Sequence, residues 1–122
     1  MKQILLDTSF ILTSIRNKID FIEELTFKGL KILVPKQVLQ EITRITKSKK
    51  KLRFRDEAAL ALKVLENSEF KKIDLKSKNT DNGIVKYSED HDVIVATLDR
   101  ELKRNVKGQR LIIRGKKKLE II

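Results

Sequence analysis

Four acidic residues have positions in the sequence that suit joint chemistry. Asp7 directly follows one short apolar run, and Asp99 lies three residues after the end of another. Glu41 and Asp81 lie on segments with helical spacing, at or near the apolar side of each. Carboxylates that converge at one place repel one another, and a protein tolerates this mainly when a divalent cation offsets the charge. The pattern therefore predicts a site that binds a metal ion, formed by Asp7, Glu41, Asp81 and Asp99.

The other residue types narrow the identity of the ion. The chain has no cysteine and a single histidine, His91, which excludes disulfides, thiolate sites, cysteine nucleophiles and two-histidine zinc sites. Oxygen ligands alone favour Mg²⁺ or Mn²⁺ over zinc. The hydroxyls beside the acids (Thr8, Ser9 and Thr97) are expected to hold a carboxylate or a metal-bound water. Taken singly, each acid is equally compatible with capping a helix.

The apolar pattern predicts the elements that position these acids. Continuous apolar runs at 4–6, 32–34, 93–96 and 111–113 are typical of strands covered on both faces, and 70–75 is a weaker fifth strand. Helices are expected over 9–16, 19–27, 35–46, 56–66, 81–89 and 99–104. This alternation predicts one domain (1–122), an α/β fold with a doubly wound three-layer α/β/α sandwich and a mostly parallel four- to five-stranded sheet. Asp7 and Asp99 would then emerge at the same edge of the sheet.

The charge balance suggests the kind of partner. The 122 residues include 28 Lys and Arg against 17 Asp and Glu, a formal charge of +11, which implies a polyanion such as nucleic acid or an acidic membrane surface. Nine residues, 47–55, carry much of this charge between two expected helices; they form either a solvated linker or a nucleic-acid contact in which Phe54 stacks on a base. The apolar tail 119–122 is expected to dock on the domain or on a partner.

No apolar run approaches the ~18 residues of a membrane span, and no signal-peptide pattern opens the chain, so we expect a cytoplasmic protein without membrane partners.

Several segments resemble one known family. The opening Ile4-Leu5-Leu6-Asp7-Thr8-Ser9-Phe10, Val34-Pro35 followed by Glu41, Asn79-Thr80-Asp81 through Ile84, and Val95-Ala96-Thr97-Leu98-Asp99-Arg100-Glu101-Leu102-Lys103 together resemble the PIN-domain nucleases. The likeness covers nearly the whole chain. This chain departs from many members at Asn82 and Leu98, neither of which replaces one of the four acids.

The resemblance implies a metal-dependent endoribonuclease that cleaves RNA phosphodiesters, with Asp7, Glu41, Asp81 and Asp99 as its acidic set. It also favours a homodimer, and it leaves open an antitoxin or a ribosome-assembly factor as partner. We expect flanking RNA phosphates to contact basic residues of two segments: Lys49, Lys50, Lys51, Arg53, Arg55, Arg100, Lys103 and Arg104.

Two other functions remain open at this point. An RNA-binding module without turnover, for example a ribosome-assembly factor, would have the same fold, although it would have no need of the four acids. A phosphoacceptor signalling receiver also gathers acids at strand ends. Its first strand usually leads into paired acids, whereas Asp7 here is followed by Thr8 and Ser9, which disfavours that class.

Overall fold

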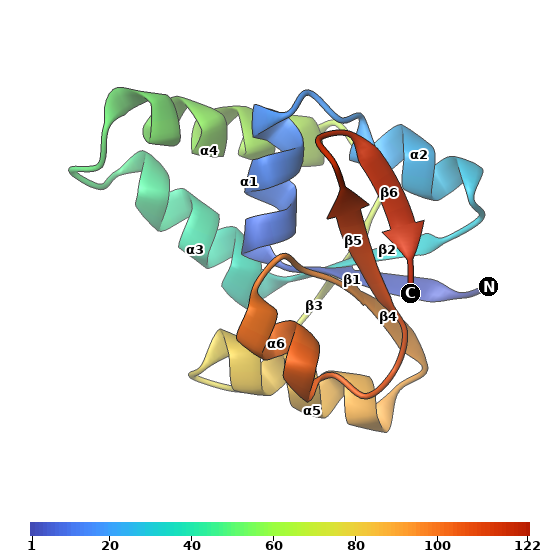
Figure 1. Cartoon of the computed structure of the whole chain (residues 1–122). Coiled ribbons are helices and arrows are strands. Elements are labelled where there is room, and N and C mark those ends of the chain that lie inside the picture. Colours follow the sequence, from blue (N-terminus) through green and yellow to red (C-terminus); the bar gives the residue numbers. More distant parts are fainter.

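The computed structural model describes residues 1–122 as strands and helices that alternate through most of the chain (Figure 1). The elements in order are β1 (Gln3–Leu6), α1 (Thr8–Arg16), α2 (Phe21–Phe27), β2 (Lys31–Pro35), α3 (Lys36–Thr46), α4 (Leu52–Glu66), β3 (Lys71–Ile73), α5 (Thr80–Asp90), β4 (Val93–Ala96), α6 (Arg100–Asn105), β5 (Arg110–Arg114) and β6 (Lys118–Ile121). No helix is long and apolar enough to cross a bilayer.

The strands form one sheet in the order β3-β2-β1-β4-β5-β6. All neighbours are parallel except β5 and β6. From β1 the chain adds β2 and β3 on one side, and β4 and β5 are then added on the other side. The boundary between β1 and β4 is therefore the switch point of this doubly wound sheet, the place where such folds form ligand sites outside the carboxyl ends of the strands.

Both faces of the sheet are covered, as the continuous apolar runs predict. Ile4 and Leu6 of β1 belong to the larger core, which β1, β2 and β4 form with α1, α2, α3 and α4. Leu5 belongs to a smaller core on the other face, shared with Ile84 of α5 and Leu102 of α6. Because neighbouring residues of a strand point to opposite faces, a strand buried on both sides has no polar position. The predicted three-layer α/β/α architecture is confirmed.

The sheet has six strands, so the expected count of four to five is wrong. The additional strand is the apolar tail, which returns as β6 and pairs antiparallel with β5, placing Leu119 opposite Ile113. Gly115, at φ +63°, supplies the left-handed residue that the tight turn between the two strands requires. Leu119 is buried in the larger core. The tail therefore docks on its own sheet.

The basic segment 47–55 is only partly a linker. α4 begins at Leu52 and not near Asp56, so that Arg53 and Arg55 lie within the helix. Leu and Arg favour helices, and α4 packs along α3 as a hairpin whose tip, 47–51, projects from the body of the molecule (Figure 1). The boundaries of the other helices differ from those predicted by one or two residues.

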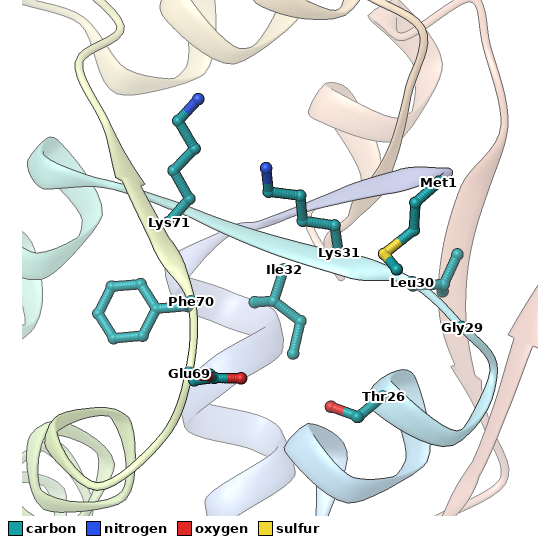
Figure 2. Close-up of a pocket in the computed structure, with 9 residues that line it drawn as sticks. All are labelled: Met1, Thr26, Gly29, Leu30, Lys31, Ile32, Glu69, Phe70 and Lys71. Carbon is teal, nitrogen blue, oxygen red and sulfur yellow. The ribbon is translucent and has the colours of Figure 1, made fainter.

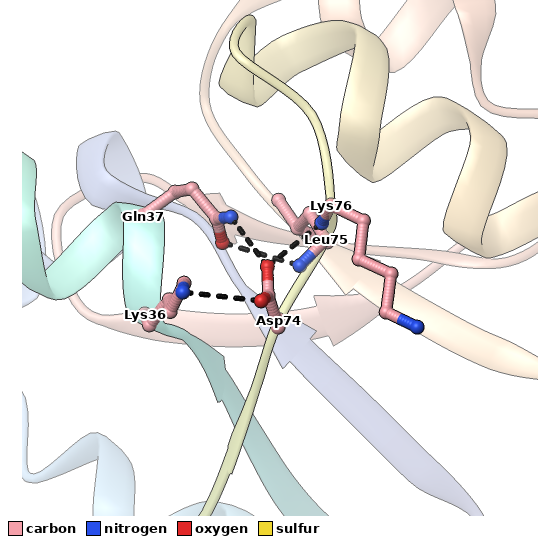
Figure 3. Close-up of polar contacts among 5 residues, drawn as sticks. All are labelled: Lys36, Gln37, Asp74, Leu75 and Lys76. Carbon is pink, nitrogen blue, oxygen red and sulfur yellow. Dashed lines mark hydrogen bonds and ion pairs between the residues drawn. The ribbon is translucent and has the colours of Figure 1, made fainter.

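A polar cluster anchors the loop between β3 and α5 to the start of α3 (Figure 3). Gln37 donates from Nε2 to Asp74 Oδ1 at 2.8 Å and accepts from the Leu75 N–H at 3.2 Å. Asp74 also accepts from the Lys76 N–H and pairs with Lys36 Nζ at 3.1 Å. The hydrogen bond from Gln37, followed by those from Lys76 and Lys36, lowers the pKa of Asp74 to about 2. We call these five residues the Asp74 clasp.

Gly83 lets this loop lie against α5. A Cβ at this position would stand 3.0 Å from the Cβ atoms of Leu75 and Ser77. Because a Cβ is bonded directly to the backbone, these atoms could move away only if the loop itself moved. The loop and the first turns of α5 are therefore fixed to each other, and through the clasp to α3.

We expect Gly83→Ala to destabilise the protein. Alanine would favour the helix by about 1 kcal/mol, but crowding against the anchored loop should cost about 1–3 kcal/mol. In the middle of this range the net loss is about 1 kcal/mol, which should lower the melting temperature by about 3–5 °C in a thermal melt. Gly108→Ala is the matched control, because its Cβ would meet nothing closer than 3.9 Å, and it should melt like the wild type. A Gly83→Ala protein that melts higher would mean that the loop is free to move.

Candidate functional site

Asp7 lies at the centre of the carboxyl edge of the sheet. Its N–H donates to the Ala96 carbonyl at 3.0 Å, which extends the β1–β4 pairing by one residue, and the residue is only 5% exposed. Oδ2 accepts hydrogen bonds from Thr97 Oγ1 at 2.7 Å and from Ser9 Oγ at 3.1 Å. Asp7 occupies the cap position of α1, but its side chain makes no capping bond. The helix-cap alternative therefore does not account for this carboxylate.

Two hydroxyls connect the exit of β4 to the start of α1. Ser9 Oγ and Thr97 Oγ1 are 3.3 Å apart. Ser9 Oγ also accepts from the Leu98 N–H at 3.1 Å, and Thr97 Oγ1 accepts from the Asp99 N–H at 3.1 Å. Each hydroxyl thus accepts a backbone bond while donating to Asp7, so its proton has a fixed direction. The network holds the buried carboxylate in one orientation.

Asp99 and Glu41 lie at the border of the same edge. Asp99 caps α6 by accepting the Leu102 N–H on Oδ1 at 3.0 Å, and the residue is otherwise exposed. Glu41, half-buried on α3, accepts from Thr8 Oγ1 at 2.8 Å. In Figure 1 the N-terminal ends of α1, α3 and α6 lie together at this edge. The hydroxyls of Thr8, Ser9 and Thr97 all contact an acid of the set.

Asp81 lies in the first turn of α5 and is exposed. It is not the cap of this helix, because Asn79 occupies the cap position and accepts the Asn82 N–H at 2.9 Å. The side chain of Asp81 makes no hydrogen bond or ion pair. Its carboxylate is therefore free to interact with the other acids or with a ligand.

The acids influence one another electrostatically. Burial raises the pKa of Asp7 and the charge of Asp99 adds to this, against the opposing hydrogen bonds from Thr97 and Ser9. Burial also raises the pKa of Glu41, with further contributions from Asp7 and Asp81. The pKa of Asp81, although the residue is largely exposed, is raised by partial desolvation and then by the charges of Asp7 and Asp99.

No cation neutralises this group of acids. The ion pairs of the structure lie elsewhere, at Lys2–Asp92, Arg16–Glu57, Lys36–Asp74 and Arg114–Glu120. Arg44, one turn after Glu41, weakly opposes the rise in that residue's pKa. In a chain with a net charge of +11, a set of four acids without ion pairs is a local excess of negative charge.

The donor set fits a hard divalent cation in type. All the groups are carboxylates and hydroxyls, which suit Mg²⁺ or Mn²⁺. No three acidic or histidine side chains lie close enough together to ligate one ion directly. This spacing agrees with the usual coordination of Mg²⁺, which is held by one or two carboxylates and keeps several waters.

The basic residues that the sequence singled out lie on two elements, the α3–α4 hairpin and α6. Lys49, Lys50 and Lys51 are exposed at the tip of the α3–α4 hairpin, and Arg53 follows in α4. On α6, which follows Asp99 directly, Arg100 and Arg104 are exposed and Lys103 is half-buried.

Phe54 and Arg55, near the start of α4, are only partly exposed to solvent. The guanidinium groups of Arg53 and Arg16 lie 4.8 and 5.8 Å from the centre of the Phe54 ring, so this ring already has cationic partners. Arg55 is half-buried, and its Nε makes no hydrogen bond. A base that stacks on Phe54 would have to displace a guanidinium.

Sequence analysis missed two contributions to the site. Glu101, in the first turn of α6, adds to the charges that raise the pKa of Asp81. The sequence indicates this role of Glu101 only by its position two residues after Asp99, in the first turn of the helix that Asp99 caps. The Asp74 clasp was also missed, because the pairing of Asp74 with Gln37 across 37 residues has no local signal.

A separate cavity of about 530 Å³ lies at the opposite edge of the sheet, where β2 and β3 begin (Figure 2). Lys31 and Lys71 extend to one side of these strands, whereas Glu69 and Thr26 lie on the other side. None of the four acids lines it, and its polar groups do not converge. The chemistry of the chain is therefore concentrated at the carboxyl edge.

Comparisons with known proteins agree with this architecture. A family model described as a PIN-like domain matches residues 4–116, and the chain therefore belongs to the PIN-like domain family. No curated protein matches it in sequence.

Two solved structures share the fold. One is a chain of VapBC2 from Rickettsia felis, crystallised with a DNA fragment from its promoter: 19% identity over 88% of this chain and 98% of that one, with a TM-score of 0.62. The other is a domain of a functionally unknown protein from Methanocaldococcus jannaschii: 16% identity over 100% of this chain and 99% of that one, with a TM-score of 0.64. At these identities the likeness concerns the fold.

We expect Asp7→Asn to raise the melting temperature in chelator at neutral pH, by about 2–5 °C. Because the folded-state pKa of Asp7 is raised, the stability linked to its protonated form is complete below the unfolded pKa, near about 4, and is lost as the pH rises through the folded value. The amide stays neutral, has nearly the same size, and can still accept from Thr97 and Ser9. Thermal melts between about pH 4 and pH 8 measure the difference, which should disappear at the acid end.

Asp56→Asn is the matched control, since Asp56 is exposed on α4 and makes no hydrogen bond or ion pair, and it should melt like the wild type. If Asp7→Asn melts below the wild type throughout, the Asp7 charge is needed for folding and the assignment of strain to this carboxylate is wrong.

Proposed function

We propose that this protein is a metal-dependent endoribonuclease, a hydrolase that cleaves RNA phosphodiester bonds at the carboxyl edge of the sheet. The observation that carries the proposal is Asp7: a carboxylate 5% exposed, oriented by Thr97 and Ser9 and left without a cationic partner. Burying an ionised carboxylate without a cationic partner costs stability, a cost that a neutral amide in the same place would not have. Membership of the PIN-like family supports the same activity.

In this proposal Asp7, Asp81, Asp99 and Glu41 hold Mg²⁺ or Mn²⁺, one or two of them directly and the others through water. A bound ion would lower the pKa of a water molecule, and its positive charge would offset the negative charge that develops on the phosphate. Thr97 and Ser9 fix the direction of the Asp7 carboxylate, and Thr8 fixes that of Glu41. Asp99 retains one oxygen for this role while the other caps α6.

The basic residues bind the RNA on both sides of the cleaved bond. α6 (Arg100, Lys103 and Arg104) begins directly after Asp99, and the hairpin tip (Lys49, Lys50 and Lys51, with Arg53 and Arg55 behind it) lies at the C-terminal end of the helix that carries Glu41. A strand bound by both groups would pass the acids. Phosphates attracted to these groups would be brought to the acidic site despite its negative charge, once an ion is present.

A protein partner is part of the proposal. The Rickettsia felis relative of the same fold was crystallised as VapBC2, a two-component assembly, and on that ground we propose that an antitoxin-like protein binds this chain. A ribosome-assembly partner and a homodimer remain predictions of the family resemblance, and a cytoplasmic location remains a prediction from the sequence pattern.

Incubation with single-stranded RNA and Mn²⁺ should yield internal cleavage products, which denaturing gels resolve. Asp7→Asn should slow cleavage by about 100-fold or more, the scale on which removal of one key group from a reaction centre acts. Asp56→Asn should cleave like the wild type. Crystals soaked in Mn²⁺ should show anomalous density within ~2.0–2.4 Å of a carboxylate oxygen of the four acids.

The second candidate, an RNA-binding module without turnover, is favoured by one observation: no three carboxylates lie close enough together to enclose an ion. The same experiment separates the two. Retention of RNA without cleavage in either Mg²⁺ or Mn²⁺, and Mn²⁺ density only at Asp90 and Asp92 or nowhere, would replace the nuclease by the binding module.

Replacing Lys49, Lys50, Lys51 and Arg53 with Gln should weaken RNA binding and flatten its dependence on salt. For every phosphate of a single strand that the variant no longer binds, the slope of log K against log salt should fall by roughly 0.7. Binding isotherms at several salt concentrations measure this slope. The matched control is an exposed pair in the turn between β5 and β6, Lys116 and Lys117, whose replacement should leave the slope nearly unchanged. Equal slopes for the wild type and the hairpin variant would make segment 47–55 a solvated connection.

A further inference from the structure

A groove of about 580 Å³ runs along α5, between this helix and the loop that follows β3. Leu75, Lys76 and Ser77 form its loop side, and Lys86, Tyr87 and His91 form its helix side. We call it the α5 groove. None of the residues proposed above to hold the ion or the RNA lines it, so it is an additional feature of the molecule.

An aromatic pair lies at the far end of the groove. The rings of Tyr87 and His91 stack face to face, with centroids 3.9 Å apart and planes inclined by 11°. Tyr87 is half-buried against the smaller core, whereas His91 is exposed. His91 Nδ1 donates to the Tyr87 carbonyl at 3.1 Å, which holds the imidazole in this orientation. The stack therefore presents a planar surface that is rigid before any ligand binds.

The charge of the groove favours an anion near its entrance. The side chain of Lys76 extends away from Asp74 (Figure 3), and Lys86 of α5 also lines the groove. The carboxylate of Asp74 also borders the groove, but Lys36, Gln37 and the Lys76 N–H already occupy it. Asp90, the other acid of the lining, lies at the His91 end. Lys76 and Lys86 form no ion pair, so both are free to contact an anion.

The groove begins where the acidic site ends. Asn82 and Gly83, which line it, directly follow Asp81 in the first turns of α5. Tyr87 and His91 lie six and ten residues beyond Asp81, which corresponds to about 9–15 Å along a helix. A few nucleotides of single strand cover this distance. The loop side keeps its position because the clasp and the contact at Gly83 fix it.

We infer that the α5 groove binds single-stranded RNA a few nucleotides away from the cleaved bond: a base stacks on the His91–Tyr87 pair, and Lys76 and Lys86 contact neighbouring phosphates. That the bound strand is RNA rests on the proposed function. The test does not, because it measures binding in the absence of cleavage. Stacking on an aromatic surface beside basic side chains is the usual way in which proteins hold single strands without strict sequence preference.

The chain offers a direct probe, because Tyr87 is its only tyrosine and it has no tryptophan. In chelator, which prevents metal-dependent cleavage, titration with single-stranded oligoadenylate should quench the tyrosine fluorescence saturably. His91→Ala should weaken binding by about 5- to 100-fold, the range for removal of one base stack, whereas His91→Phe should restore it. Lys86→Gln should reduce the salt slope by about 0.7, and Lys116→Gln, the same change outside the groove, should not.

The outcomes separate this inference from the nuclease itself. Quenching that depends on His91 and Lys86, in a protein that cleaves no RNA with Mn²⁺, would support the groove and refute the proposed function. Cleavage without quenching, with unchanged affinity for His91→Ala, would refute the groove and leave the nuclease. Equal quenching by free AMP and by the oligomer would also refute it, because the groove would then bind a free nucleotide.

Discussion

The parallel pairing of β1 with β4 is the contact on which the rest of the site depends. Its register places Leu6 beside Ala96, so that the chains leave the sheet side by side as Asp7 and Thr97. A slip of one residue would turn every side chain of β1 to the opposite face and remove Asp7 from the hydroxyls that hold it. The two cores prevent such a slip, because Leu5 and its neighbours Ile4 and Leu6 fit opposite faces. Apolar burial thus sets the position of a charged group.

The distribution of charge follows from the same arrangement. Many cations of this basic chain lie on the hairpin tip, on α6 and along the α5 groove, and none of them forms an ion pair with the four acids. The acids lie where helix N-termini meet, and the partial positive charge of these termini favours carboxylates there. The protein can therefore keep a local negative centre without neutralising it by its own lysines and arginines. An external cation has no internal competitor at this place.

Much of the fold could be predicted from the sequence, because its signals are local. Apolar runs indicated the central strands, helical spacing indicated the helices, and the residue after each run indicated the edge at which Asp7 and Asp99 emerge. The tail was ambiguous because a short apolar segment has the same pattern in an edge strand and in a docked terminus. The start of α4 was misplaced because a run of lysines is also typical of a linker, although Arg and Leu both favour helices.

The finer parts of the site had no such signals. The order of hydroxyls around Asp7 depends on a contact across 90 residues, and the clasp on one across 37. Asn79 and Asp81 are only two residues apart, and which of them caps α5 depends on the residue at which the helix begins. Contacts of this kind follow from the fold and cannot be derived from spacing along the chain.

The cap at Asp99 has a consequence for how such a chain can evolve. One oxygen of the Asp99 carboxylate caps the N-terminus of α6, and the hydroxyls around Asp7 require only a hydrogen-bond acceptor. An amide satisfies both requirements, and an aspartate codon becomes an asparagine codon by a single base change. Folding and charge are therefore separable at these two positions. A descendant could lose its affinity for cations in one mutational step, keep its core and its basic surfaces, and persist as a protein that only binds.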